Sequence, residues 1–354
     1  MSQLLLTTCP GLEDIALEEV RRLLTVVEAK IKPLGVQGRL IVKCGESEDY
    51  ASSLLNMKSR LIHRVSILLS VNKISRKICG LDDIYRCTLK SGIEEYIGPH
   101  VSFAVRAERL GSHEYTSMDI AWVAGKAIKD LYSRVGPSPP VNLDYPAVIV
   151  RVDVIGETCF ISICTTGDQS LHRRGYRVYD HPAALKPTIA YAMAMMSQVS
   201  ENSVVVDPMC GGGTIPIECC FLGFQCKIYG MDISPKHVQG AKLNALAAGV
   251  HDKISFRVGN ARRIDEELNI DIDRIISNLP YGIRAGRRSI IKPLYRDFLS
   301  SARKTLKDDG LITILTTELR LIKRLANDLN YAVKGYRRVF HGNLHPFIVM
   351  LQKS

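Results

Sequence analysis

Short apolar runs alternate with longer amphipathic stretches through the second half of the chain. Runs of strand length stand at residues 203–207, 227–232, 254–260, 273–278 and 311–317. The stretches between them repeat apolar residues at helical spacing. Strands that alternate with helices predict a mostly parallel, doubly wound sheet, whose ligands bind at the carboxyl ends of the strands. The predicted helices of this half are 215–224, 235–249, 292–306 and 318–329, and its closing strands are 331–340 and 345–352.

The first half has a less regular pattern. A helix is predicted at 10–24, where Leu12, Ile15, Ala16 and Val20 form one apolar face. This order of elements predicts an α+β fold. The other predicted elements are a helix at 53–71 that runs into an apolar stretch, helices at 81–98 and 118–135, a strand at 101–110, and two antiparallel strands around Gly156 within 141–166.

Length and charge narrow the class of protein. The chain has 354 residues, which suits two or three domains at roughly 100–200 residues each. The net charge of +11 favours a polyanionic partner, of which nucleic acid is the commonest. A generally basic protein without such a partner could have the same charge, so only sequence motifs can distinguish the two classes.

The location and the metal content are also predicted from composition. No apolar run approaches the ~18 residues of a membrane helix, and the N-terminus lacks the pattern of a secretory signal. We therefore expect a cytoplasmic protein that does not engage a membrane. The ten cysteines have no zinc-site spacing, so we expect thiols in a reducing compartment and no metal.

A glycine-rich turn follows the first strand of the second half. In DPMCGGGTIPIE the strand ends at Asp207, and Gly211 and Gly213 let the backbone approach a bound ligand. The turn lacks the Gly-Lys-Ser/Thr of a phosphate-binding loop, and Pro216 stands where a dinucleotide fingerprint has its third glycine. Asp232 ends the next strand, at the ~20-residue distance from which a carboxylate accepts hydrogen bonds from ribose hydroxyls.

The next two strands also end in distinctive residues. The third ends in Gly-Asn-Ala at 259–261, placed to meet an adenine edge, and the fourth ends in SNLPYG. An exocyclic amine on a base is a poor nucleophile because its lone pair is delocalised, so it needs acceptors for its N–H groups. We expect the Asn278 side-chain oxygen and the Leu279 carbonyl as acceptors, with Pro280 fixing the turn. Tyr281 offers a ring for base stacking, which contributes ~1–3 kcal/mol.

These four strand ends resemble the motifs of class I S-adenosylmethionine-dependent methyltransferases, over residues 188–354. The fourth resembles the (Asp/Asn/Ser)-Pro-Pro-(Tyr/Phe/Trp) signature of enzymes that methylate planar exocyclic amines, with Leu279 in place of the first proline. The resemblance implies a Rossmann-like fold, S-adenosylmethionine as the cofactor, and Asn278, Leu279, Pro280 and Tyr281 as the catalytic loop. The cofactor-binding residues that it implies are Asp207, Met209, Cys210, Gly211, Gly213, Thr214, Asp232, Ile233, Asn260, Ala261 and Asn278.

The first half resembles the THUMP-containing RNA-modifying enzymes, in its opening TTCPGLEDIALEEV, its α+β pattern and the basic segment HRRGYR. The resemblance implies a ferredoxin-like domain at 1–62, a THUMP domain at 63–166, a linker at 167–187 and a methyltransferase domain at 188–354. It also implies tRNA as the partner, with the 3′ end gripped by THUMP. The chain is most similar to the tRNA guanosine-6 N2-methyltransferases, which implies methylation in the acceptor stem. We expect a monomer.

Basic residues near the linker and the amine-binding loop are candidates for phosphate contacts. The alternative for each is a solvated basic loop. Histidines are scattered without metal spacing, and we expect the linker to bring at most His172 and His181 near the site. The expected RNA-binding residues are Arg173, Arg174, Arg284, Arg287, Arg288 and Lys292.

Other functions remain open from the residues alone. A sister family methylates guanosine-10, another relative acts on ribosomal RNA, and the fourth motif also serves adenine-N6 methyltransferases. A pyrimidine carbon methyltransferase would need a nucleophilic cysteine near the loop, and residues 227–354 contain none. A nicotinamide dehydrogenase would need the third fingerprint glycine, and the intact Asp207, Asp232 and Asn278 argue against a non-catalytic RNA-binding protein.

Overall fold

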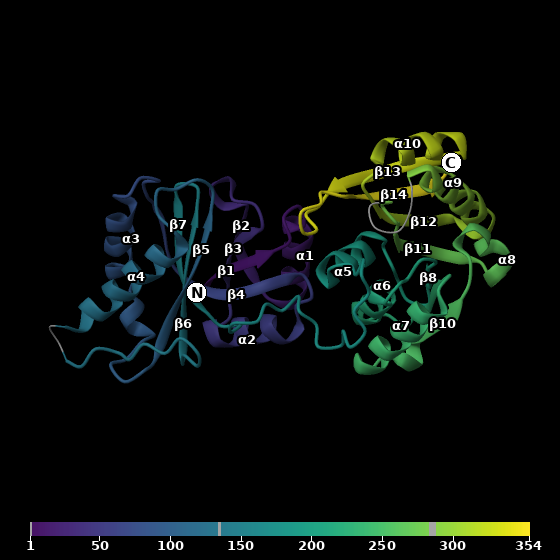
Figure 1. Cartoon of the computed structure of the whole chain (residues 1–354). Helices are drawn as coiled ribbons and strands as arrows, with labels where there is room; N and C mark the ends of the chain where they lie inside the picture. The colour runs from purple at the N-terminus through teal and green to yellow at the C-terminus, as the bar shows by residue number, and fades with distance from the viewer. Residues whose placement is uncertain (1, 134–135, 283–287) are drawn as a thin grey trace. The chain divides into compact units, whose positions relative to one another are not determined.

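The structure is a computed structural model that describes residues 2–133, 136–282 and 288–354. The chain forms two compact units. Unit 1 consists of residues 1–8 and 16–171, and unit 2 of residues 9–15 and 172–354. Each unit is built around its own sheet (Figure 1).

Unit 1 contains a seven-stranded sheet in the order β2-β3-β1-β4-β7-β6-β5. Its neighbouring strands are antiparallel, except that β5 and β6 are parallel. Helix α2 packs on β1 and β4, while α3 and α4 pack together and α4 covers β5 and β6. The strands are β1 Ser2–Thr8, β2 Val26–Ile31, β3 Arg39–Cys44, β4 Ile62–Lys73, β5 Phe103–Leu110, β6 Val148–Ile155 and β7 Thr158–Cys164. The helices are α1 Glu13–Leu23, α2 Glu48–Lys58, α3 Gly80–Leu89 and α4 Ser117–Tyr132.

The helix predicted at 53–71 was wrong in its second part. Ser47 caps α2 by accepting a hydrogen bond from the Tyr50 amide, and this helix ends at Lys58. The apolar residues that follow form β4, which pairs with both β1 and β7. A short apolar run buried between two strands has the same composition as a buried helix, so periodicity did not separate them. The antiparallel pair around Gly156 is confirmed as β6 and β7.

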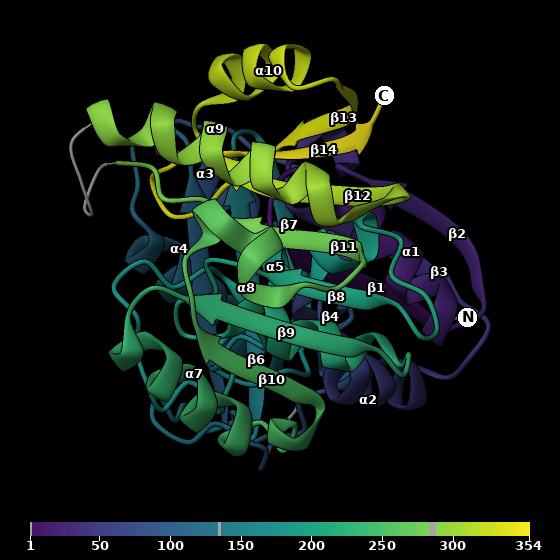
Figure 2. The ribbon, with the colours of Figure 1, turned by 90° about the vertical axis from the view of Figure 1, so that its right-hand side faces the viewer.

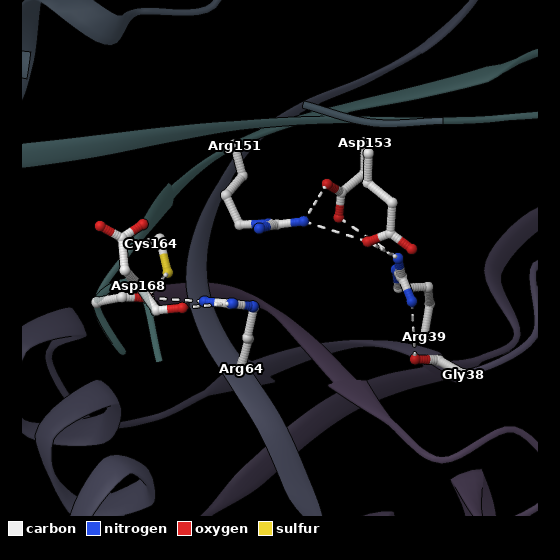
Figure 3. A network of polar contacts seen from close by, with 9 residues as sticks. Gly38, Arg39, Arg64, Arg151, Asp153, Cys164 and Asp168 are labelled. Atoms are coloured by element: carbon white, nitrogen blue, oxygen red, sulfur yellow. Dashed lines mark hydrogen bonds and ion pairs between the residues drawn. The ribbon is translucent and has the colours of Figure 1, made fainter. Parts of the chain in front are cut away.

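A buried ionic cluster joins three strands of unit 1 (Figure 3). Arg151 Nη2 lies 2.8 Å from Asp153 Oδ1 and 3.2 Å from Glu108 Oε2. Arg39 Nη2 lies 3.0 Å from the same Glu108 oxygen and 3.5 Å from Asp153 Oδ2. Arg39 belongs to β3, Glu108 to β5 and Arg151 and Asp153 to β6. The cluster therefore links β3 with the adjacent strands β6 and β5, neither of which is its neighbour in the sheet order.

Unit 2 contains a second seven-stranded sheet in the order β10-β9-β8-β11-β12-β14-β13. Strands β10, β9, β8, β11 and β12 are mutually parallel, and β14 pairs antiparallel with β12 and β13. The strands are β8 Val204–Asp207, β9 Lys227–Asp232, β10 Ile254–Val258, β11 Ile272–Asn278, β12 Leu306–Thr316, β13 Tyr331–Arg338 and β14 Phe347–Lys353. The helices are α5 Pro187–Met196, α6 Thr214–Cys219, α7 Pro235–Ala247, α8 Ile264–Leu268, α9 Arg288–Thr305 and α10 Leu319–Asp328.

Helices cover both faces of the unit 2 sheet, as the alternating pattern predicted. Residues of α8, α9 and α10 share one core with β11 and β12, including Tyr295 and Phe298, which are fully buried. Helices α5, α6 and α7 lie on the other face (Figure 1), and Figure 2 shows α9 running across the front of the sheet. No helix in the described part of the chain is long and apolar enough to cross a membrane.

The boundary between α9 and β12 differs from the prediction. The helix ends at Thr305 and the strand begins at Leu306, whereas the sequence predicted a strand from residue 311. Leu306 pairs with Ile272, and the register then shifts so that Leu311 pairs with Arg274. This irregularity takes up residues 307–310 inside the strand, whereas the sequence predicted that the preceding helix stops at Gly310.

Candidate active site

The first and fourth motifs meet where the strand order of unit 2 reverses direction. Strands β8 and β11 are parallel neighbours there, and the helices that come next in the chain, α6 and α9, lie on opposite faces of the sheet. Asp207 ends β8 and Asn278 ends β11. Ser277, which is fully buried, donates a hydrogen bond from Oγ to Asp207 Oδ1 at 2.8 Å. Ligands of doubly wound sheets bind at this position, so the geometry favours one site built from both motifs.

The glycine-rich turn after β8 forms a cradle of backbone. Gly211 has a φ of +51° and Gly213 a φ of +79°, a region that favours glycine. A Cβ on Gly213 would lie 3.0 Å from the Cβ of Ala241 and 3.1 Å from the Phe256 ring. Gly213 therefore holds the turn against α7 and β10. Cys210 is buried beneath the turn, and its amide donates to the Met231 carbonyl at 2.7 Å.

The Asp207 carboxyl group lies entirely inside the protein. Burial raises its pKa from 3.8 to about 7, and the Ser277 hydroxyl and the Met209 amide act in the opposite direction by donating to it. The Met209 hydrogen bond measures 3.2 Å. Asp207 thus fixes the start of the turn and its contact with the fourth motif. Burial also raises the pKa of the Cys210 thiol, so this cysteine is not poised as a nucleophile.

Asp232 closes the cradle from the second strand. Its Oδ2 accepts the Gly211 amide at 3.0 Å, and its Oδ1 accepts the Ser234 amide at 2.9 Å. His237 Nδ1 lies 3.2 Å from the same Oδ1. The carboxylate keeps lone pairs for further donors, since each oxygen can accept two hydrogen bonds. The next residue, Ile233, is 71% exposed and offers an apolar side chain beside the turn.

The third motif begins a short 3₁₀ turn at residues 261–263. Asn260 accepts the Arg262 amide through its side chain at 3.0 Å, and its own amide donates to Glu267 at 3.2 Å. Ala261 is buried. The Asn260 side chain thus caps this turn. A polar cavity of about 460 Å³ borders Asn260 and continues to Arg262, Asp297 and Lys304.

Three hydrogen bonds hold the NLPY loop after β11. The Leu279 amide donates to the Leu315 carbonyl at 3.0 Å, and its side chain is 1% exposed within the core. The Tyr295 hydroxyl donates to the Pro280 carbonyl at 2.9 Å. The Tyr281 hydroxyl donates to Asn278 Oδ1 at 2.7 Å. The usual proline at position 279 would lack the N–H of the first bond, which explains why leucine suits this chain.

The residues expected to contact RNA differ in their surroundings. Arg173 and Lys292 are exposed. The Arg174 side chain is only 10% exposed, and its Nε lies 3.5 Å from Oε1 of the fully buried Glu218, so its position favours a structural role. Arg284 and Arg287 lie outside the described residues, as does the side chain of Arg288, which begins α9.

Sequence motifs missed three residues that hold the site together. Ser277 precedes the fourth motif, while His237 and Asn244 lie on α7. Asn244 is 3% exposed and donates to the Gly212 carbonyl at 2.8 Å. The buried polar character of Asn244 is a signal only once α7 is placed against the turn. Among the described residues, no group of three or more His, Cys, Asp or Glu is arranged to hold a metal ion.

Comparison with known families agrees with this geometry. Residues 174–346 match the family described as RMKL-like, methyltransferase domain, and residues 69–164 match the THUMP domain. A tRNA (guanine(6)-N2)-methyltransferase of Archaeoglobus fulgidus is 36% identical over 96% of this chain and 89% of its own length. One of Methanocaldococcus jannaschii is 36% identical over 96% of each. The chain belongs to this family of THUMP-containing tRNA (guanine-N2)-methyltransferases.

A solved structure extends the family likeness to three dimensions. TrmN from Thermus thermophilus superposes with a TM-score of 0.81 and 30% identity, over the full length of both chains. The family and the fold class that the motifs predicted are confirmed. The THUMP match implies an RNA-binding module within residues 69–164. The domain boundaries at 62/63, 166/167 and 187/188 stay predictions.

Proposed function

We propose that this protein transfers a methyl group from S-adenosylmethionine to the exocyclic N2 of a guanosine in tRNA, at position 6 of the acceptor stem. The observation that carries the proposal is the junction of Asp207 and Asn278 at the reversal of the strand order. This junction supports the proposal, because a loop with the composition suited to an amine adjoins a glycine-rich turn that suits a ligand. The THUMP module supplies the contact with RNA, and we propose that it grips the 3′ end.

The residues present fit the cofactor. The left-handed Gly211 and Gly213 leave no room for side chains, so backbone alone lines the turn. Asp232 faces this turn with lone pairs that suit ribose hydroxyls. Met209, Cys210, Thr214, Ile233, Asn260 and Ala261 are the remaining residues that we assign to this cofactor site. When bound, S-adenosylmethionine supplies a methyl group on a sulfonium, which is already an activated donor.

The protein's own part is to hold the amine in line. Asn278 Oδ1 accepts one N–H of the base, and the Leu279 carbonyl is the second acceptor. With the amine held in this way, its lone pair would face the methyl group of the sulfonium; the N–C bond would form as the S–C bond breaks, leaving a neutral thioether, and the nitrogen would lose one proton. Asn278 Oδ1 already accepts the Tyr281 hydroxyl, and its second lone pair leaves room for the base. Pro280 keeps the loop rigid, so positioning supplies much of the rate.

The choice of guanosine-6 rests on the relatives. Both the Archaeoglobus fulgidus and the Methanocaldococcus jannaschii proteins carry this name and match nearly the whole chain. The test is methyl transfer from labelled S-adenosylmethionine to unmodified tRNA transcripts, followed by nucleoside analysis and mapping. N2-methylguanosine at position 6 is the expected product. Methylation at position 10, of ribosomal RNA or of adenine would each contradict the proposed site while keeping an amine methyltransferase.

The catalytic loop has its own test. Asn278→Ala removes the acceptor and leaves the backbone in place, so methyl transfer should fall below detection. The affinity for tRNA, measured by filter binding, should stay near the wild-type value. Loss of tRNA binding, with an unchanged transfer rate per bound tRNA, would show that Asn278 does not hold the reacting amine.

A further inference from the structure

The segment expected to be a plain linker follows the surface of unit 2 up to the glycine-rich turn. Arg174 pairs with Glu218 of α6, and the Tyr176 hydroxyl donates to Glu218 Oε1 at 2.8 Å. Beyond these two anchors, residues 179–184 reach the turn after β8. We call residues 179–184 the clasp.

One face of α7 receives the clasp. His237, Gly240 and Asn244 stand three and four residues apart, so they share a face of this helix. A Cβ on Gly240 would lie 2.2 Å from the Tyr179 ring, so only glycine leaves room for that ring. The Tyr179 amide donates to Asn244 Oδ1 at 2.8 Å, and Asn244 Nδ2 donates to the Tyr179 carbonyl at 3.0 Å. The start of the clasp is therefore fixed at two points.

The same asparagine ties the clasp to the turn. Asn244 Nδ2 also donates to the Gly212 carbonyl at 2.8 Å, so a single buried amide holds the clasp and the cradle together. The His181 ring lies 3.3 Å from the place where a Cβ on Gly211 would stand, and the Cβ of His181 lies equally close to that of Gly212. The clasp thus covers the cradle at Gly211 and Gly212, the first two of its three glycines.

His181 and His237 connect the clasp to Asp232. The rings of His181 and His237 meet edge to face, with centroids 4.3 Å apart and an interplanar angle of 82°. His237 Nδ1 lies 3.2 Å from Asp232 Oδ1, while Asp232 Oδ2 accepts the Gly211 amide. The contacts therefore form a closed ring through the clasp, α7, the second motif and the first motif.

The His181 ring has a defined hydrogen-bonding role. Its Nδ1 accepts the Ala183 amide at 3.1 Å, which places the ring proton of the neutral form on Nε2. Burial lowers the pKa of His181, and the neighbouring His237 lowers it further, while Asp232 and Asp180 act in the opposite direction. The ring atoms Cε1, Nε2 and Cδ2 lie 3.3–3.4 Å from the place of a Cβ on Gly211, so this side of the ring packs against that glycine.

We propose that the clasp is a wall of the cofactor site, in which His181 binds the cofactor over Gly211 and His237 positions the Asp232 carboxylate. The proposal rests on the proposed function, since it concerns the same S-adenosylmethionine site. His181 offers an N–H donor to an oxygen of the ribose or amino-acid part of the cofactor. His237 acts through Asp232 and is a positioning residue.

Cofactor binding by the full-length protein tests this. S-adenosylmethionine and S-adenosylhomocysteine are titrated by calorimetry, without tRNA, into wild type, His181→Ala, His237→Ala and the double variant. Each single change should raise the dissociation constant about tenfold. Because the two rings act as one unit, the double variant should lose no more than the weaker-binding single variant. His251→Ala, an exposed histidine of the same unit, is the matched control and should bind as wild type.

Conservative variants separate binding from folding. His237→Asn keeps a donor near the Nδ1 position and His181→Gln keeps one near Nε2, so both should restore affinity to within about threefold of wild type. Melting temperatures without ligand should stay close to wild type for these two variants. Unchanged affinity in both alanine variants would overturn the proposal, as would equal losses in the alanine and the conservative variants. A wild-type protein that binds neither compound would instead overturn the proposed function.

Discussion

Leu279 is the residue at which this chain departs from the usual amine-methyltransferase signature. Its amide donates to the Leu315 carbonyl, and its side chain is packed in the core of unit 2. Leu279→Pro would restore the usual signature but remove the N–H, and a carbonyl left without a partner costs about 1–3 kcal/mol. The melting temperature and the transfer rate should both fall.

Leu279→Met is the control for this change. It keeps the N–H and nearly the same volume, a substitution that usually costs less than about 1.5 kcal/mol. Thermal unfolding and methyl transfer of both variants are compared in parallel. A proline variant as stable and as active as wild type would show that the Leu315 hydrogen bond does not account for the leucine.

Asp207 should make the stability of the cofactor-free protein depend on pH. Its pKa is raised to about 7 by burial, so the folded state keeps a proton that the unfolded chain releases above its ordinary pKa of 3.8. Unfolding then releases a proton between these values, and stability should fall as pH rises through that window. Above pH 7 this contribution should be constant.

The comparison with Asp207→Asn isolates that carboxyl group. The variant has no proton to release at this position. Its melting temperature should therefore fall less than that of wild type as the pH rises from 5 to 7, the pKa of Asp207 in the folded protein being about 7. Histidines titrate in both proteins and cancel in the difference. Asp252→Asn, an exposed change, should keep the wild-type slope. Identical slopes in wild type and Asp207→Asn would contradict the inferred protonation of Asp207.

The sequence predicted the regular alternation of strands and helices in unit 2 better than the irregular order of strands in unit 1. The parallel sheet of unit 2 followed from apolar runs separated by amphipathic helices, and Asp207, Asp232 and Asn278 end their strands as expected. The third strand ends at Val258, two residues before Asn260. Strand β4 was read as helix, and the three strands β1, β2 and β3 were not predicted. Their pairing depends on partners distant in sequence, such as β1 with β4, which no local pattern contains. The contacts between His181 of the clasp and α7 were not predicted either, because these residues are also distant in sequence.

The buried ionic cluster of unit 1 is the clearest case for an element-scale test. Asp153 is 1% exposed and faces both Arg151 and Arg39 (Figure 3). Asp153→Asn leaves two buried guanidinium groups with less opposing charge, and breaking a buried pair typically destabilises by about 3–5 kcal/mol. We expect amides of β5 and β6 to lose protection against hydrogen exchange.

Unit 2 provides the internal reference for that measurement. Peptides from β8 and β11 should exchange as in wild type, because the change concerns the other sheet. Asp130→Asn breaks an exposed pair with Lys126 on α4 and should leave protection unchanged. Equal loss of protection in both units would show that the cluster does not act locally on β3, β5 and β6.

At the scale of the whole molecule, the excess of 47 basic over 36 acidic residues should make tRNA binding depend strongly on salt. We expect the neighbouring residues Arg173 and Arg174 to differ in role, the first contacting RNA and the second stabilising the fold. Arg173 is exposed, so Arg173→Ala should weaken tRNA binding and reduce the slope of log affinity against log salt by about one.

Arg174→Ala should act on folding rather than on RNA. It leaves the buried Glu218 carboxylate with the Tyr176 hydroxyl but without its guanidinium, so the melting temperature should fall while the salt slope of the folded fraction stays at the wild-type value. Filter binding of tRNA at several salt concentrations, beside thermal unfolding, measures both effects. A reduced salt slope for Arg174→Ala with unchanged stability would reverse the assignment, because it would place that guanidinium on a phosphate rather than on Glu218.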